Sequence, residues 1–548
     1  MILIFPPAFY PHMPYLALPS IKAFLEINGL RSEVRDYNVL FYRQILKKQF
    51  VEECYNKIVA SPVERLREGD INSTLLTGHE DIPFIFDHLE RAIASIDGIE
   101  DGYDFSDSID YSKIIDLALM IISDAFYPLD LNLSDLEMSH SYSSSSEVKR
   151  AIEDRTQNIF ISYFENELDD FNDASNEPFG ISITAQTQII PAFTLCRLIR
   201  EKMPERKIIL GGEIVTRLAS IFKTDNCLSS LYDDIIIFEG EERLLKYLSG
   251  NEGNGKAIGS AETITDITSL PSPNFEDLPL TQYFDKNLIL SIQASRRCYW
   301  GKCKFCDIPY GYDSIYRHRD AKQIVDEIEY LKEKYQTRYF KFIDDAVHPI
   351  LMREISEEIL KRNISINWEV YAILEKQFMD EELVSTISAA GCKWLYFGFE
   401  SGDKSIVSSM TKRSSFPNVS QILSTTAVAG IKNHLWVMFG FPGEKLSNYE
   451  NTLSFIEANK SNIHSIEVNQ FSLTKHSAIF QETDYTKYHF KPIIEENQDL
   501  ALLFDYTTED GFIDQHHAKE LVYKLRDTIE QESGLVNAVR SSNIFYDD

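Results

Sequence analysis

The chain has 548 residues, of which 44% are apolar and 25% are charged, a mix typical of globular domains. This length is enough for two to four domains with buried cores and excludes wholesale disorder. Acidic residues number 85 against 54 lysines and arginines, so the formal net charge is −31. An acidic surface repels phosphate backbones and anionic lipid, so we expect neither nucleic acid nor a membrane as a partner.

The start of the chain and its cysteines favour a cytoplasmic location. Met1–Pro7 is a short apolar run without basic residues, which we interpret as a buried strand and not as a signal peptide. No stretch of 18 or more uncharged apolar residues predicts a membrane span. Of the seven cysteines, four are scattered and three fall within nine positions, which is not the pattern of a disulfide scaffold.

Residues 1–250 predict a parallel α/β domain with an insertion. Residues 1–38 read as strand, helix and strand. Residues 39–177 break this pattern with helix-like stretches and polar connections, and we interpret them as a mainly helical insertion. The alternation then resumes with strands that end near Thr184 and Gly212. Strands alternating with helices form a parallel sheet, and ligands bind beyond the carboxyl ends of such strands.

A second α/β series follows. Residues 251–283 are rich in Gly, Asn, Thr and Pro, as linkers are. Residues 284–485 contain six strand-like segments separated by amphipathic helices, which predicts a (β/α)6-type partial TIM barrel with its active site at the strand carboxyl ends. Residues 486–548 are polar and predict a C-terminal helical region. The predicted fold class is therefore α/β: a Rossmann-like domain, a partial barrel and a helical tail.

Three cysteines lie on one short segment at the end of the first barrel strand. The segment SRRCYWGKCKFCDIPYGY spans residues 295–312 and contains Cys298, Cys303 and Cys306. Three thiolates can hold three irons of a [4Fe–4S] cubane and leave the fourth iron open, whereas an electron carrier would need a fourth cysteine. The competing hypothesis is a non-catalytic scaffold stapled by zinc. Zinc prefers four ligands, and no second C-x2-C pair or H-x3–5-H follows.

This segment resembles the radical S-adenosylmethionine (SAM) superfamily, whose usual motif is C-x3-C-x2-C with an aromatic residue before the last cysteine. Phe305 takes the aromatic place, but the first spacing here is C-x4-C. The resemblance implies that the three cysteines bind a [4Fe–4S] cluster, that SAM chelates the open iron and that the backbone of Phe305 contacts the adenine. It also implies a 5′-deoxyadenosyl radical and an electron donor such as flavodoxin or ferredoxin.

Polar residues at later strand ends extend the resemblance over residues 284–480. FIDDA follows the second strand, GFESG the fourth and MFGFPGE the fifth, where the family contacts the amino group, the ribose or carboxylate, and the adenine side of SAM. Each segment also has an ordinary interpretation as a helix cap or a turn. The SAM-binding residues implied by the resemblance are Asp344, Asp345, Glu400, Ser401, Gly443 and Glu444.

The segments IFPPAFYP, GISITAQTQ, ILGGEIVT and IIFEGEE resemble the cobalamin-binding subfamily of radical SAM proteins. The resemblance implies a corrinoid lined by Ser182, Thr184, Gly211 and Gly212, where glycine allows close backbone approach. The DxHxxG signature of another class of cobalamin proteins is absent, as it is from many members of this subfamily. A Rossmann-like domain that has lost the corrinoid is the alternative.

These patterns together predict a radical SAM enzyme that reductively cleaves SAM. We expect cobalamin-dependent methyl transfer to an unactivated carbon of a small molecule or peptide. The alternative within the same class is a rearrangement, epimerisation or oxidation without cobalamin. The sequence singles out no catalytic acid or base.

Overall fold

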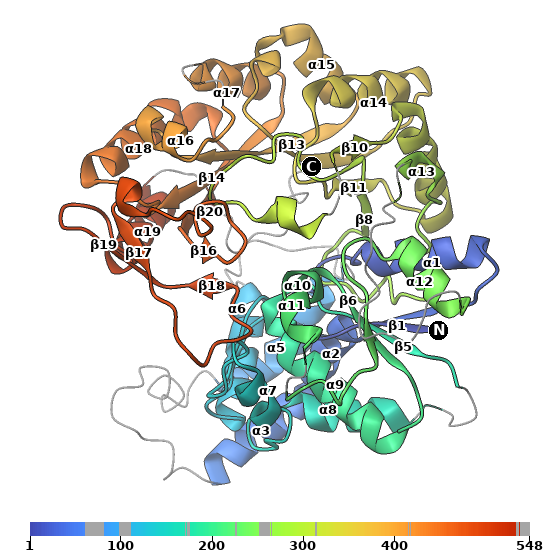
Figure 1. The fold of residues 1–548 in the computed structure, drawn as a ribbon. Coiled ribbons are helices and arrows are strands. Elements are labelled where there is room, and N and C mark those ends of the chain that lie inside the picture. The colour runs from blue at the N-terminus through green and yellow to red at the C-terminus, as the bar shows by residue number, and fades with distance from the viewer. Residues whose placement is uncertain are drawn as a thin grey trace. The chain divides into compact units, whose positions relative to one another are not determined.

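The computed structural model divides the chain into two compact units, each with its own sheet (Figure 1). Unit 1 comprises Met1–Glu262, Pro273–Leu288 and Asn497–Leu500, and unit 2 comprises Thr263–Ser272, Ile289–Glu496 and Ala501–Asp548. The residues that the structure describes are 1–60, 82–97, 111–169, 171, 176–224, 227–250, 264, 266–312, 315–414, 416, 418–532 and 536–537. Within these ranges, none of the helices combines the length and the apolar character needed to cross a bilayer.

Unit 1 is built on a five-stranded parallel sheet of order β2-β1-β5-β6-β7. Side chains of β1 and β5 are buried on both faces, as a parallel sheet covered by helices requires. The Rossmann-like sheet predicted for this region is therefore confirmed. Its strands are β1 (Ile2–Phe5), β2 (Glu33–Asp36), β5 (Phe179–Ser182), β6 (Ile208–Gly211) and β7 (Asp234–Ile235).

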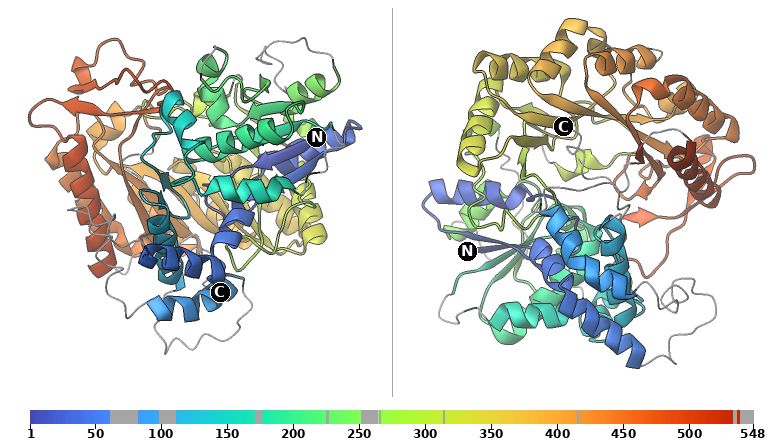
Figure 2. Two further views of the ribbon diagram at one scale, coloured as in Figure 1. Left: turned by 90° about the horizontal axis from the view of Figure 1, so that it is seen from below. Right: turned by 180° about the vertical axis from the view of Figure 1, so that it is seen from behind.

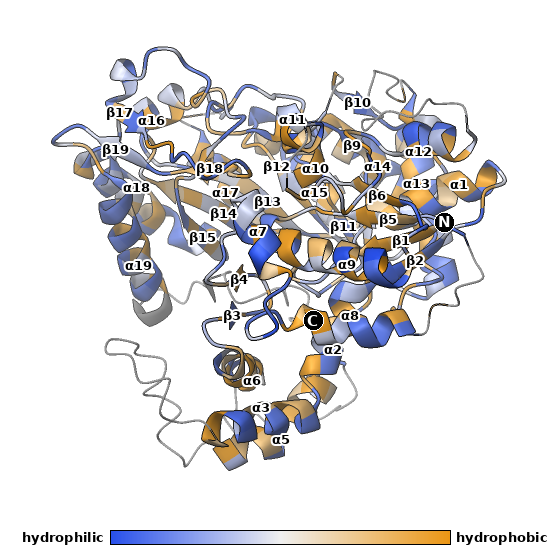
Figure 3. Ribbon diagram, turned by 60° about the horizontal axis from the view of Figure 1, so that its bottom comes forward, coloured by the Kyte–Doolittle hydropathy of each residue, from blue (hydrophilic) through white to orange (hydrophobic). Residues whose placement is uncertain are grey.

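The helices of unit 1 form two sets. Those that follow strands of the sheet are α1 (Ala17–Ile27), η1 (Gln186–Gln188), α9 (Ile189–Lys202), α10 (Glu213–Arg217), α11 (Ala219–Phe222) and α12 (Glu241–Leu248). Those inserted between β2 and β5 are α2 (Tyr37–Ile45), α3 (Lys48–Ala60), α5 (Ile82–Ile96), α6 (Tyr111–Ala125), α7 (Ser145–Ala151) and α8 (Phe160–Asp169), with a hairpin of β3 (Asp130–Leu131) and β4 (Leu136–Glu137). α3, α5 and α6 are amphipathic and pack against one another (Figure 3). The described part of the insertion is thus mainly helical, as predicted.

Unit 2 is built on a seven-stranded sheet of order β20-β15-β14-β13-β12-β11-β8, in which all neighbours are parallel. The strands are β8 (Ile289–Ile292), β11 (Tyr339–Phe342), β12 (Asn367–Ala372), β13 (Cys392–Glu400), β14 (Lys432–Phe439), β15 (Ser465–Gln470) and β20 (Val536–Asn537). Helices α13 (Ala321–Tyr335), α14 (Pro349–Lys361), α15 (Glu381–Ala389), α17 (Val419–Val428) and α18 (Leu446–Asn459) follow the strands in turn and lie along one side of the curved sheet (Figure 2). The predicted partial barrel is confirmed.

The two faces of this seven-stranded sheet differ in chemistry. Phe342 and Val370 are paired across β11 and β12 and are fully buried in an apolar face. The adjacent register row pairs Lys341 with Glu369 on the opposite face. Side chains alternate along a strand, so one face of β11 and β12 supplies the core and the other supplies polar groups.

Shorter elements complete unit 2. They are η2 (Ile267–Ser269), β9 (Ser295–Arg296), η3 (Ile308–Gly311), β10 (Arg317–His318), η4 (Lys376–Met379), α16 (Lys404–Ser409), η5 (Lys460–Asn462), β16 (Leu473–Thr474), η6 (Thr486–Tyr488), β17 (Phe490–Pro492), β18 (Leu503–Phe504), β19 (Tyr506–Thr508) and α19 (Gln515–Glu532). The region after β15 therefore contains small strand pairs as well as a long helix.

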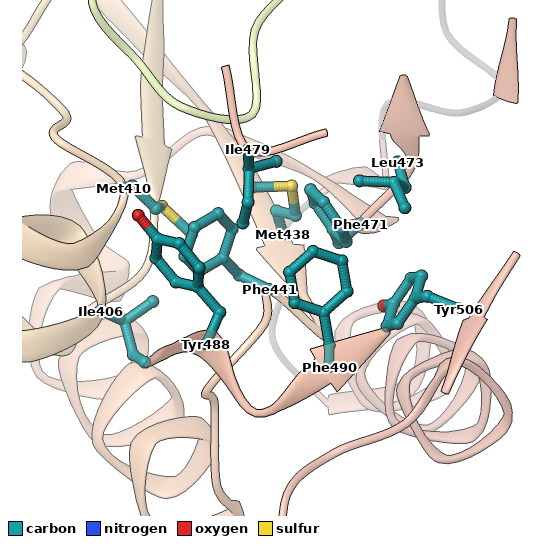
Figure 4. Close-up of a cluster of buried hydrophobic side chains, with 10 residues drawn as sticks. All are labelled: Ile406, Met410, Met438, Phe441, Phe471, Leu473, Ile479, Tyr488, Phe490 and Tyr506. Atoms are coloured by element: carbon teal, nitrogen blue, oxygen red, sulfur yellow. The ribbon is translucent and has the colours of Figure 1, made fainter. Parts of the chain in front are cut away.

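One apolar cluster joins these C-terminal elements to the barrel (Figure 4). Its buried members are Ile406, Met410, Met438, Phe441, Phe471, Leu473, Ile479, Tyr488, Phe490 and Tyr506. Phe305 of the cysteine segment packs against this cluster. Burial of a large apolar side chain stabilises a fold by about 1.5–3 kcal/mol, so the cluster anchors the cysteine segment to the barrel.

Candidate functional site

The cysteine segment forms a loop at the carboxyl end of β8. β9 pairs antiparallel with β10, and the three cysteines lie between these two short strands. Arg297 (φ 69°) and Gly301 (φ 58°) both have left-handed backbone in this loop. Gly301 lies within the longer first spacing, and glycine adopts this conformation without steric cost.

Asp344 ties the start of this loop to the end of β11. Its carboxylate accepts hydrogen bonds from the N–H of Ala294 (2.9 Å) and from the hydroxyl of Ser295 (2.6 Å), as well as from the Ser295 N–H. Burial raises the pKa of Asp344 to about 6, although these donors favour the charged form. Asp344 therefore positions the cysteine loop, and its contact with SAM stays a prediction.

The three thiols are partly buried and interact with one another. Burial raises the pKa of Cys303, and the nearby charge of Cys298 raises it further. Burial likewise raises the pKa of Cys306 to about 12, with Cys303 and Asp345 adding to the effect. Cys303 and Cys306 therefore hold their protons more tightly than free thiols do, so their binding to a metal cluster would release protons.

The three thiols supply the ligand set that a cubane with one open iron requires. In such a cluster each thiolate binds a separate iron. Across the described ranges of the chain, no group of three or more His, Cys, Asp or Glu side chains is gathered closely enough to hold a single metal ion.

A segment far along the chain lies against this loop. The segment is Met410–Arg413, which follows α16, and we call it the clasp. The N–H of Lys304 donates to the carbonyl of Met410 (2.9 Å), and the indole N–H of Trp300 donates to the carbonyl of Thr411 (2.9 Å). The sequence analysis did not single out these residues.

The clasp carries a buried cation. Lys412 Nζ lies 2.8 Å from Glu400 Oε1 and 5.6 Å from the centroid of the Phe305 ring. Glu400 has a left-handed backbone (φ 67°) beside a register shift at the end of β13. Burial opposes the charge on Lys412, but the attraction of Glu400 outweighs burial and raises the pKa of Lys412. The ammonium group of Lys412 therefore lies beside Glu400 at the cysteine loop.

Two residues within the C-x4-C spacing, Tyr299 and Trp300, also contact side chains elsewhere in unit 2. Tyr299 donates to Glu375 Oε1 (3.3 Å), and Arg413 Nε lies 2.5 Å from the same oxygen. The Arg413 guanidinium also lies 5.8 Å from the Tyr299 ring and 5.4 Å from the Trp300 ring. The longer loop thus packs its aromatic pair against the clasp, so the departure from the usual spacing has a structural reason.

Other residues predicted to bind SAM lie in internal hydrogen bonds. Ser401 is fully buried, and its hydroxyl lies 3.2 Å from that of Thr452. Gly443 has φ 92°, and Glu444 beside it is fully buried and accepts from the Gly440 N–H (2.6 Å). Burial raises the pKa of Glu444 to about 8. The structure therefore brings Phe305, Asp345 and Glu400 to the cysteines, and the SAM contacts of all these residues stay predictions.

In unit 1, the four predicted corrinoid-binding residues lie at the carboxyl edge of two neighbouring strands. Ser182 ends β5 and Gly211 ends β6, with Thr184 and Gly212 just beyond them. Gly212 has φ 101°, and a Cβ there would lie 2.5 Å from the carbonyl oxygen of Ile183. Gly212 is therefore required by local packing, and its contact with a corrinoid stays a prediction.

The polar face of the seven-stranded sheet carries a network that the sequence analysis missed. Glu369 pairs with Lys341 Nζ (2.8 Å) and accepts from the Tyr396 hydroxyl (2.9 Å). His434 Nδ1 lies 2.7 Å from Ser465 Oγ, and burial lowers the pKa of His434 to about 3, so this ring is neutral. Charged residues that alternate with apolar ones in YFKFIDD and INWEVYA are the signal that could have revealed this network.

The comparisons with known proteins agree with this geometry. Residues 292–456 match the family model described as the radical SAM superfamily, and the match includes all three cysteines. This part of the chain is a radical SAM domain, and the resemblance inferred from the cysteine segment is confirmed.

Several of the relatives are named methyltransferases. The chain is 24% identical over 350 residues to a bacteriochlorophyllide d C-12(1)-methyltransferase of Chlorobaculum tepidum, covering 62% of this chain and 70% of the relative. The fold matches the radical SAM methyltransferase TsrM of Kitasatospora setae, solved with cobalamin and a [4Fe–4S] cluster (TM-score 0.56, 12% identity, 98% and 93% coverage). It also matches the cobalamin-dependent radical enzyme OxsB, solved with aqua-cobalamin and SAM (TM-score 0.53, 15% identity, 74% and 68% coverage). At these identities the structural likeness is one of fold.

Proposed function

We propose that this protein is a cobalamin-dependent radical SAM methyltransferase acting on an unactivated carbon of a small molecule or peptide. The observation that carries the proposal is the set of three thiols on the loop after β8, in a chain that shares the fold of TsrM over nearly its whole length. Three thiolates leave one iron of a cubane open. The proposal includes a flavodoxin or ferredoxin as electron donor and a cytoplasmic location.

In unit 2, the residues around the loop have separable roles. Cys298, Cys303 and Cys306 would hold the cluster, which when bound supplies the electron that cleaves SAM. Asp344 holds the start of the loop through its three hydrogen bonds. Asp345 acts electrostatically on Cys306 and so lies on the side where the polar groups of SAM would bind.

In unit 1, the proposed cobalamin site is the carboxyl edge of β5 and β6. A Cβ on Gly211 would meet only the carbonyl oxygen of Ile236, at 3.8 Å, so no atom crowds the backbone at this strand end. Ligands of open parallel sheets bind at such edges. Ser182 and Thr184 on the neighbouring strand end would add hydroxyl groups to the cobalamin site.

The test is anaerobic purification of the full chain from cells supplied with hydroxocobalamin. We expect about four iron and four sulfide per chain, about one corrinoid, and release of 5′-deoxyadenosine or S-adenosylhomocysteine from SAM after reduction. One zinc per chain without SAM cleavage would support a scaffold instead. An intact cluster with SAM cleavage but no retained corrinoid would support a cobalamin-free reaction.

A further inference from the structure

Lys412 of the clasp is held at the cysteine loop by several contacts. Its Nζ lies 2.8 Å from Glu400 Oε1 and 5.6 Å from the centroid of the Phe305 ring, and Phe305 lies between the last two cysteines in the chain. Gly398 on β13 has no side chain, and a Cβ there would collide with Nζ. Glycine at this position is what leaves space for the ammonium group.

The neighbours of Lys412 fix its position as well. The carbonyl of Met410 accepts a hydrogen bond from the N–H of Lys304, which is next to Cys303. The backbone N–H of Arg413 donates to the Cys303 sulfur. The clasp is thus bonded to the loop on both sides of Lys412, and these bonds hold the backbone of Lys412 against the cysteine loop.

The charges of this pair are little exposed to water. The side chains of Lys412 and Glu400 are only 11% and 12% exposed. Screening by water and salt is weak for such groups, so each charge acts strongly on its surroundings. Lys412 acts on Cys303 and Cys306, and Glu400 acts on Cys303. The positive charge of Lys412 and the negative charge of Glu400 therefore both act on Cys303.

We propose that Lys412 and Glu400 form a charge pair that sets the reduction potential of the cluster held by the three cysteines. The inference rests on the proposed function, because it requires the cluster. One-electron reduction by an external donor adds one negative charge to the cluster, and no bond forms or breaks in this step. The ammonium of Lys412 stabilises the reduced cluster, and the carboxylate of Glu400 opposes it.

The experiment is an anaerobic redox titration of the reconstituted full-length protein, followed by the EPR signal of the reduced cluster before any SAM is added. Lys412→Met should lower the ratio of reduced to oxidised cluster at the parental midpoint about tenfold, a shift of about 59 mV for a one-electron couple. Glu400→Gln should move the ratio in the opposite direction. The double variant, Lys412→Met with Glu400→Gln, should have a midpoint potential closer to that of the parental protein, because both charges are gone.

Two variants separate this effect from damage to the fold. Lys404→Met removes a charge from an exposed position at the start of the neighbouring helix α16 and should leave the midpoint unchanged. Lys412→Arg keeps the positive charge, so its midpoint potential should stay near that of the parental protein. Iron content and near-ultraviolet circular dichroism, measured on each protein, identify any variant that lost the loop structure.

The outcomes separate this inference from the proposed function. If the single variants keep the cluster but their midpoint potentials do not shift, or shift with the same sign, the inference alone is overturned. A changed SAM affinity with an unchanged midpoint also overturns it, because Lys412 would then act on SAM and not on the cluster. A parental protein that assembles no cluster overturns the proposed function and, with it, this inference.

Discussion

The two parallel sheets of this chain are built from the same strand–helix alternation but differ in how polar groups are arranged. In unit 1, β1 and β5 bury side chains on both faces, and their one polar side chain is Ser182 at the carboxyl end of β5. In unit 2, the sheet buries one face and places Lys341, Glu369 and Tyr396 on the other. A sheet buried on both faces confines chemistry to its loops, whereas a curved sheet offers a face as well as an edge.

The largest expected effect lies at the edge of the unit 2 sheet. Replacing Cys303 with alanine leaves two thiolates for a cluster that needs three, so we expect loss of the cluster and of SAM cleavage down to background. Iron and sulfide analysis and the yield of 5′-deoxyadenosine measure this. Cys227→Ala is the matched control, because Cys227 lies in unit 1 and should leave both values at parental levels. Parental SAM cleavage by the Cys303 variant would refute the site.

The polar face of the unit 2 sheet should be the next most sensitive region. Lys341→Met leaves the Glu369 carboxylate buried without its cation, which should cost about 3–5 kcal/mol in the free energy of unfolding. All four tryptophans lie in unit 2, so tryptophan fluorescence during urea denaturation reports this unit alone.

Two controls sharpen this second prediction. Ile466→Val on β15 removes one methylene from a fully buried apolar residue and should cost only about 0.5–1.5 kcal/mol. The double variant Lys341→Met with Glu369→Gln should lose less than the single variant, because no unpaired charge remains. Equal losses in the single and double variants would show that the pair does not act as a unit.

A buried carboxyl group should make unit 2 sensitive to pH above neutrality. The folded pKa of Glu444 is about 8 against an ordinary value of 4.5, so the folded state keeps a proton that the unfolded state releases. Stability is then highest at low pH and falls as pH rises towards about 8, by about 1 kcal/mol per pH unit. Burial also raises the pKa of Asp36 in unit 1 and of Asp344 in unit 2, but only to about 6, so we assign the slope between pH 6.5 and about 8 to Glu444.

Glu444→Gln provides the check on this pH dependence. Glutamine keeps an oxygen that can accept from the Gly440 N–H but cannot ionise. The unfolding free energy of this variant, followed by tryptophan fluorescence, should be nearly flat from pH 6.5 to 8 and higher than the parental value at pH 8. A slope like that of the parental protein would assign the titration to another group.

The smallest expected effect compares one glycine from each unit. Gly398→Ala displaces the Lys412 ammonium group, so we expect about a tenfold lower rate of SAM cleavage with the cluster retained. Gly240→Ala, just before α12 in unit 1, meets only the ends of two isoleucine side chains, at 3.4 and 4.0 Å, so it should leave that rate unchanged. Single-turnover assays with reduced protein measure both. Equal rates in the two variants would mean that the position of Lys412 has no effect on the reaction.

Much of this molecule could be predicted from local patterns. The strands and helices of both sheets follow from hydrophobic periodicity, which is a property of short segments and survives in any tertiary context. The cysteine motif is equally local, because Cys298, Cys303 and Cys306 fall within nine positions on one loop. These features were enough to assign the fold class and the three cluster ligands before any contact was known.

The surroundings of that loop depend on which strands pair. Lys412, Glu375 and Arg413 reach the cysteine loop only because β12 and β13 lie in the same sheet as β8. No spacing rule connects Phe305 with Lys412, since the contact between them depends on the course of the chain through three dimensions. Local patterns identify the groups that could bind the cluster, whereas long-range packing decides which charges surround it.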